Sequence, residues 1–163
     1  MKKTILVRGP ALSQSGYGEH TRSVLRSLMP HGDEVDVHLV STNWGETGWL
    51  SECNEERTWV DKAIAKATAH LQSNTPYDMS IQVTIPSEWE RLAPINVGVT
   101  AGIESDRVSS EWLQRSNAMD KVITISEHSK KGFVNTTYQG HDQAGQEVSL
   151  ACTVPVEIVG YPV

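Results

Sequence analysis

The sequence has few of the residues that build disulfide frameworks or metal sites. Only two of its 163 residues are cysteines, Cys53 and Cys152, and they lack CxxC spacing. The six histidines show no HxxxH or HxH pairing. Because such frameworks and sites usually reveal themselves by these spacings, we expect two free thiols, no disulfide framework and no protein-bound metal.

Long apolar runs and clusters of positive charge are also missing. No stretch approaches the ~20 consecutive apolar residues of a membrane helix, and the apolar run at residues 5–7 stops at Arg8. A signal peptide needs an apolar region of about 7–15 residues. With 14 Lys+Arg against 20 Asp+Glu the net charge is −6, which disfavours nucleic acid and anionic lipid as partners. We therefore expect a cytoplasmic protein without a membrane span.

What the sequence does contain is an alternation of short apolar runs with amphipathic segments. This alternation is typical of βαβ units and a mostly parallel sheet. The strands are expected at residues 4–7, 35–40, 78–84, 95–100, 121–125 and 154–159. The sequence therefore predicts an α/β fold, a Rossmann-like doubly wound sheet with helices on both faces, as one domain over residues 1–163.

The helical segments between these strands are expected at residues 21–29, 60–71 and 110–117, and after Ser126. In the second, apolar residues from Val60 to Leu71 recur on one face, which we expect to be buried. Ser126 suits the N-cap of a helix whose Phe133 and Val134 face inward. The polar segment 139–146 is expected to be a mobile loop.

The loop after the first strand carries Gly16 and Gly18 and opens a helix. In a doubly wound sheet, ligands bind beyond the carboxyl ends of the strands. Glycines let the backbone approach an anion, and a helix N-terminus supplies N–H donors. The loop is not a Walker loop, and it is not GxGxxG because Thr21 occupies the third glycine position. The sequence predicts an anion-binding turn at Gly16, Tyr17 and Gly18, with a simple chain turn as the alternative.

Three segments in order carry a family resemblance. Residues 15–28 contain the glycine turn and the first helix, residues 100–112 place Glu104 ahead of Trp112, and residues 119–133 contain a strand that ends in Ser126 at the head of a helix. Together they resemble the N-terminal lobe of retaining glycosyltransferases of GT-B fold and family 4 type.

The resemblance implies an acceptor-side lobe that touches the donor's phosphates through Gly16, Tyr17 and Gly18. The nucleotide-sugar would be a co-substrate, with no bound cofactor. Several relatives contact the transferred sugar with a histidine, but this sequence has none between Thr84 and Glu127, so Glu104 is the candidate contact. The residues assigned to the acceptor and the cleft are His20, Trp44, Thr100, Gly102, Ser126 and His128.

Each of these assignments has a structural alternative. His20 is at least as well explained as a surface residue of the first helical turn. Glu104 is equally well explained as a cap of the helix that follows it. His128 is favoured as an ordinary first-turn helix residue, because no orienting partner is identifiable. For Trp44 and Trp49, packing within their own domain is slightly favoured over stacking on a ligand.

The resemblance further implies a second, nucleotide-binding lobe, which would begin near Pro162 and carry a pair of glutamates. We expect little or no transfer by the 163 residues alone. The alternative function is a stand-alone Rossmann-like module that binds a nucleotide, a phosphorylated ligand or a partner protein without catalysis. A third possibility is that the lobe pairs with itself through its cleft face. NAD is disfavoured, because residues 39–43 offer no acidic side chain for a ribose.

Overall fold

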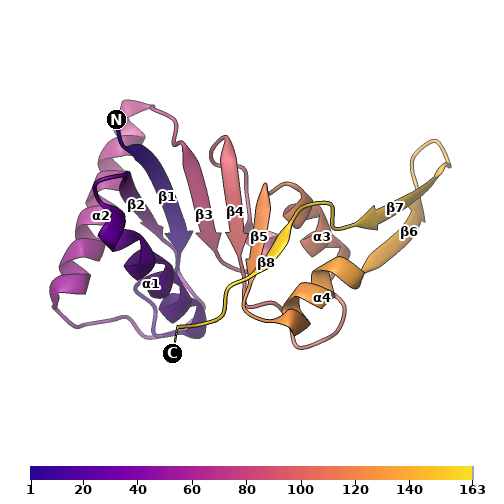
Figure 1. Cartoon of the computed structure of the whole chain (residues 1–163), viewed down its shortest axis with the longest axis horizontal. Helices are drawn as coiled ribbons and strands as arrows, with labels where there is room; N and C mark the ends of the chain where they lie inside the picture. The colour runs from indigo at the N-terminus through magenta and orange to yellow at the C-terminus, as the bar shows by residue number, and fades with distance from the viewer. Residues whose placement is uncertain (163) are drawn as a thin grey trace. The chain divides into compact units, whose positions relative to one another are not determined.

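The computed structural model describes residues 1–162 and shows an α/β chain (Figure 1). The chain divides into two compact units. Unit 1 comprises residues 1–84, 91–96 and the described residues 161–162, and unit 2 comprises residues 85–90 and 97–160. Within the described residues, no helix has the length and apolar character needed to cross a bilayer.

Unit 1 is built on three parallel strands, with β1 between β2 and β3. Its buried core joins alternate residues of the strands, such as Ile5 and Val7, to the inward faces of two helices, at Leu25 and Val60. The elements are β1 (Lys3–Gly9), α1 (Gly16–Leu28), the 3-10 turn η1 (Met29–His31), β2 (Val35–Ser41), α2 (Glu55–Ser73) and β3 (Met79–Val83).

Unit 2 also contains parallel pairing, with β5 hydrogen-bonded to β4 and to β8. Its core gathers around Trp89, Leu113 and Phe133. A Cβ at Gly98 would lie 2.6 Å from the indole of Trp89, so only glycine lets that ring lie against the strand. The elements are η2 (Pro86–Glu88), β4 (Ile95–Val99, of which residues 97–99 belong to this unit), α3 (Ser110–Asn117), β5 (Lys121–Thr124), α4 (Glu127–Asn135), β6 (Thr137–His141), β7 (Glu147–Ala151) and β8 (Val156–Ile158).

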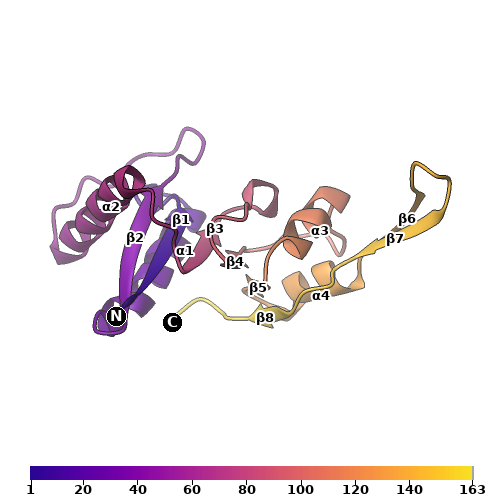
Figure 2. The same ribbon diagram turned by 90° about the horizontal axis from the view of Figure 1, so that it is seen from above.

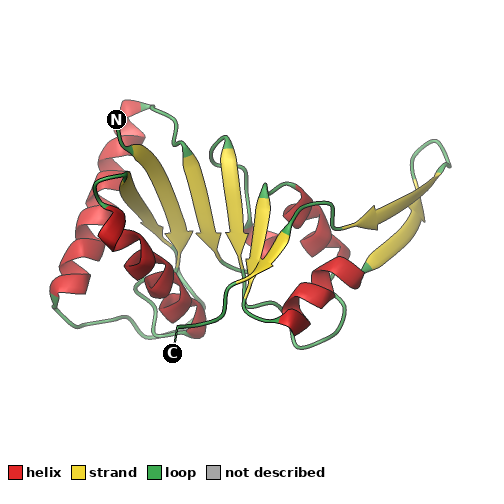
Figure 3. Ribbon diagram, in the orientation of Figure 1, coloured by secondary structure: helices red, strands yellow, loops and turns green. Residues whose placement is uncertain are grey.

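The predicted fold class is confirmed. Six strands form parallel pairs and helices flank them, as Figure 3 shows within each unit. The arrangement is consistent with a Rossmann-like, doubly wound fold. The expected strands and helices are all present, including the last strand, β8.

Three local predictions are wrong. Leu71 is 75% exposed, because the buried face of α2 ends at Ala67. Val134 is 48% exposed while Phe133 is buried, since consecutive helical residues point in different directions.

The expected mobile loop at 139–146 is instead the tip of an antiparallel hairpin formed by β6 and β7. Figures 1 and 2 show this hairpin extending away from α3 and α4. Its turn is fixed by the Asp142 carboxylate, which accepts the N–H groups of Ala144 and Gln146. Gly145 adopts a φ of +78° there, a conformation that glycine adopts without strain.

Candidate functional site

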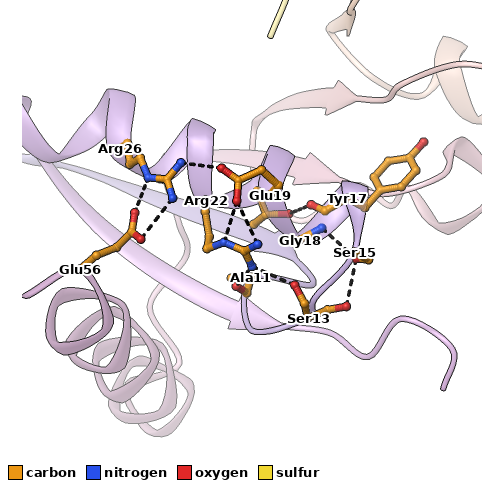
Figure 4. Close-up of polar contacts among 10 residues, drawn as sticks. Ala11, Ser13, Ser15, Tyr17, Gly18, Glu19, Arg22, Arg26 and Glu56 are labelled. Atoms are coloured by element: carbon orange, nitrogen blue, oxygen red, sulfur yellow. Dashed lines mark hydrogen bonds and ion pairs between the residues drawn. The ribbon is translucent and has the colours of Figure 1, made fainter. Parts of the chain in front are cut away.

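The glycine turn joins β1 to α1 and is organised by Ser15. Ser15 has extended backbone angles, and its hydroxyl accepts the N–H of Gly18 at 3.0 Å (Figure 4). Serine is preferred at this position because its side chain pairs one of the N–H groups that a helix leaves open at its start. One donor of the turn is therefore used by the protein itself.

Gly16 and Gly18 have different surroundings. A Cβ at Gly18 would lie 2.1 Å from the carbonyl oxygen of Ser13, whereas a Cβ at Gly16 would meet no atom within 4 Å. Gly18 is thus required for the close passage of the chain over its own loop. Gly16 is exposed and borders open space.

The buried side chain of Arg22 forms hydrogen bonds with the backbone of the same loop. Its side chain is only 8% exposed, and its guanidinium donates to the carbonyl oxygens of Ala11 at 2.7 Å and Ser13 at 2.9 Å. It also pairs with Glu19 at 3.0 Å. No sequence pattern indicated this role of Arg22, since an Arg three positions after a Glu on a helix is usually a surface pair.

The negative charge in the first turn of α1 is compensated. Arg26 contacts Glu19 at 2.7 Å and also pairs with Glu56 (Figure 4). The hydrogen bond from Arg26, with that from Arg22, lowers the pKa of Glu19 below its usual value despite partial burial. Two guanidinium groups therefore face this carboxylate, which would otherwise repel an anion at the turn.

His20 is buried, which contradicts its interpretation as a surface residue. It is 6% exposed, and its ring lies edge-on to Tyr161 with 4.9 Å between the centroids. Its buried Nδ1 has no hydrogen-bond partner among the described residues. Burial lowers the pKa of His20, so the imidazole is neutral at pH 7.

The two tryptophans of the loop after β2 differ in exposure. Trp44 is partly buried, and its ring packs on Tyr17 with centroids 4.5 Å apart. Trp49 is 58% exposed, so the favoured interpretation that it packs within its own domain is wrong. Both line a pocket of about 170 Å³.

In unit 2, the residues after β4 lie against the head of α4. Gly102 has a φ of +84°, and a Cβ there would lie 2.5 Å from the hydroxyl of Ser129. That hydroxyl donates to the carbonyl oxygen of Ala101 at 2.8 Å. Thr100, which precedes this turn, is completely buried, and its hydroxyl accepts the N–H of Gly102 at 3.2 Å.

The head of α4 supplies the other predicted residues of unit 2. Ser126 is the N-cap of α4, as predicted, and accepts the N–H of Ser129. His128 is a first-turn residue of this helix, as favoured, and its Nε2 lies 3.0 Å from the carbonyl oxygen of Glu104. Glu104 itself is exposed and caps no helix, because Ser109 is the N-cap of α3.

A second pocket, of about 550 Å³, adjoins this segment. His128, Arg107, Lys131 and Asp106 are among its lining residues. No sequence pattern indicated Arg107 or Lys131, because the two residues are separated along the chain and form no basic run. Unit 2 thus brings Glu104 and His128 together, while their roles stay predictions.

Within residues 1–162, no group of three or more His, Cys, Asp or Glu side chains is arranged to hold a metal ion. Both cysteines are free; Cys53 is exposed, and burial raises the pKa of the Cys152 thiol.

Comparisons with known proteins found no match: no family model, no curated protein and no solved structure matches this chain.

Proposed function

We propose that this chain is the acceptor-side lobe of a retaining GT-B glycosyltransferase of family 4 type, acting in the cytoplasm. In this proposal it contacts the phosphates of a nucleotide-sugar and holds the acceptor during sugar transfer. The proposal rests on the three resembling segments and on the α/β frame in which they occur.

The observation that carries it is the glycine turn at the start of α1. A helix N-terminus favours anions through its N–H groups and its dipole. Gly16 leaves the approach open, and the nearby Glu19 is paired with Arg22 and Arg26. These features support phosphate contacts at Gly16 and Tyr17. At Gly18 the N–H is bonded to the Ser15 hydroxyl, so a proposed phosphate contact there would have to replace this bond.

The proposed sugar contact is Glu104, an exposed residue whose backbone carbonyl oxygen lies 3.0 Å from Nε2 of His128 in the first turn of α4. A carboxylate accepts hydrogen bonds from sugar hydroxyls and forms stronger bonds than a neutral acceptor. The proposed acceptor residues are His20 and Trp44 in unit 1 and, separately, Gly102, Ser126 and His128 in unit 2. Thr100, which is completely buried, supports the turn at Gly102 and is not proposed as a contact. His20 acts as a neutral imidazole, because burial lowers its pKa.

We expect little or no transfer by this chain alone. In the family that it resembles, the nucleotide is held by a second lobe, and catalysis depends on keeping donor and acceptor at reacting distance. Such positioning is worth about 7–11 kcal/mol of the barrier. Sugar transfer by the purified chain without a second polypeptide would contradict this part of the proposal.

A thermal-unfolding screen tests which ligand class the chain binds. UDP, GDP, UDP-glucose, GDP-mannose and NAD are added separately to the purified chain. A ligand at 100 times its Kd adds about 2.7 kcal/mol to the free energy of unfolding, which raises the Tm by several degrees at about 2–4 °C per kcal/mol. We expect shifts from nucleoside diphosphates or nucleotide-sugars, and none from NAD.

Gly16→Val is the matched variant for this screen. It fills the open approach to the turn without a clash in the protein, so it should abolish the ligand-induced shift while the unliganded Tm is preserved. Gly140→Val is the control, because Gly140 also has open surroundings but lies in the β6–β7 hairpin. Equal shifts in wild type and Gly16→Val, or no shift with any phosphate ligand, would refute the proposal.

A further inference from the structure

A small pocket beside the glycine turn lies between two loops of unit 1. It encloses about 170 Å³ and is lined by Ser13 from the first loop and by residues of the loop after β2, among them Asn43, Trp44, Thr47 and Trp49. Pockets for drug-sized ligands measure about 300–1,000 Å³. The volume of this pocket therefore suits a single small ring.

The two loops are bound to each other by backbone hydrogen bonds. Gln14 N–H donates to the carbonyl oxygen of Gly48 at 2.8 Å, and Leu50 N–H donates to that of Leu12 at 2.9 Å. The Gln14 side chain adds a bond to the carbonyl oxygen of Trp49 at 3.1 Å. The pocket walls are thus held in place before a ligand arrives, which reduces the entropic cost of binding.

Hydroxyl groups connect the pocket to the glycine turn. The Ser13 hydroxyl lies 2.6 Å from that of Thr47 and 2.9 Å from that of Ser15, the N-cap of α1. The Thr47 hydroxyl in turn donates to the carbonyl oxygen of Trp44. The polar wall of the pocket is therefore fixed to the start of α1.

The chemistry of the walls selects the class of ligand. Among the described residues that line the pocket, none is charged: they offer hydroxyls, an amide, backbone groups and two indoles. An ionic ligand would lose hydration here without gaining a charged partner. Trp49 is more than half exposed, and Trp44 already packs on Tyr17, so Trp49 has the indole that is free to stack on a ligand.

We propose that this pocket binds an uncharged sugar ring. The indole of Trp49 covers the apolar C–H face of the ring. The amide of Asn43 and the hydroxyls of Ser13 and Thr47 form hydrogen bonds with the OH groups of the sugar. Indole rings supply large rigid contact area at low entropic cost. The inference that the pocket binds a sugar depends only on the pocket described above. That this sugar is part of the acceptor rests on the proposed function.

Saturation-transfer NMR with a sugar panel tests the inference. The purified chain is mixed separately with glucose, galactose, mannose, N-acetylglucosamine, glucuronate and glucose 6-phosphate. We expect saturation of the ring C–H protons for at least one neutral sugar and a weaker signal for both anionic ones. No signal from any neutral sugar, or a stronger signal from an anionic one, would overturn the inference.

Variants locate the binding. Trp49→Ala should weaken the sugar at least about tenfold, whereas Trp49→Phe, which keeps an aromatic face, should retain more affinity. Leu71→Ala is the control, because Leu71 is exposed on α2, outside the pocket. Unchanged binding in Trp49→Ala, with its Tm near that of wild type, contradicts the inference.

The two proposals fail separately. Binding of a neutral sugar through Trp49, without binding of any nucleoside diphosphate, would support the sugar pocket and refute the transferase assignment. Binding of UDP or GDP through the glycine turn, without binding of any neutral sugar, would support the transferase assignment and refute the sugar pocket.

Discussion

Glycine is required at Gly18 for steric reasons but not at Gly16, and the stability of variants can show this difference. Gly18→Ala puts a methyl group 2.1 Å from the backbone oxygen of Ser13, and we expect the free energy of unfolding to fall by about 1–3 kcal/mol. Gly16→Ala meets open space and should stay within about 0.5 kcal/mol of wild type. Urea unfolding of both variants checks this, and equal losses would contradict it.

Arg22 stabilises the turn through buried hydrogen bonds rather than through a surface ion pair. Arg22→Met leaves the carbonyl oxygens of Ala11 and Ser13 without these donors, so we expect a loss of about 1–3 kcal/mol in the free energy of unfolding. Arg26→Met is the control. Arg26 is partly exposed, and surface ion pairs contribute about 0–1 kcal/mol. If both variants lose the same amount in urea unfolding, Arg22 has no special role.

His20 should make stability depend on pH near neutrality. Burial lowers its pKa in the folded chain, whereas in the unfolded chain it is near 6.5. Below about pH 6.5 the unfolded chain binds more protons, so the free energy of unfolding falls as the pH falls. His20→Gln should flatten this dependence between about pH 5 and 7, measured by urea unfolding.

The comparison for this variant is Leu71→Ala, since Leu71 is exposed on α2 and has no titratable group. It should leave the pH dependence of wild type intact. The account of His20 fails if wild type shows no loss of stability over this range, or if His20→Gln keeps the same slope.

The environments of single site residues depend on distant parts of the chain, which limits prediction from sequence. Ser126 was predictable as an N-cap because its partner lies three residues away. The burial of His20 was not predictable, because its ring lies against Tyr161, near the far end of the chain. The exposure of Trp49 likewise follows from the pairing of its loop with residues 12–14, for which no local pattern exists.

Among the elements, α4 depends on its cap. Ser126→Ala removes the acceptor for the N–H of Ser129 and should cost about 1 kcal/mol of the free energy of unfolding. Ser126→Asp restores an acceptor and should recover most of it. Thermal unfolding of the two variants decides the matter, and an Asp variant as unstable as the Ala variant would exclude the capping role.

Periodicity predicts that an element exists, but not how far its buried face extends. The spacing of apolar residues predicted α2, yet Leu71 is exposed, because the core contacts of the helix stop at Ala67. The β6–β7 hairpin was missed for a related reason. Its inward pair, Tyr138 and Leu150, lies outside the polar segment 139–146, which has no apolar alternation of its own.

At the scale of the whole molecule, each unit carries a different part of the proposed activity. Unit 1 holds the glycine turn and the neutral pocket, and unit 2 holds Glu104 and His128 beside the head of α4. The net charge of −6 gives no general attraction for an anionic donor. Phosphate binding therefore depends on the local donors of the glycine turn.

The most direct test of the central claim is an amide-resolved NMR titration of the ¹⁵N-labelled chain with UDP and with GDP. Uridine and guanosine, which lack phosphate, are the controls. The account predicts saturable shifts at the amides of Gly16, Tyr17 and Gly18 with at least one diphosphate, and none there with either nucleoside. The absence of shifts at these three amides with both diphosphates at millimolar concentration, or equal shifts with the nucleosides, would contradict it.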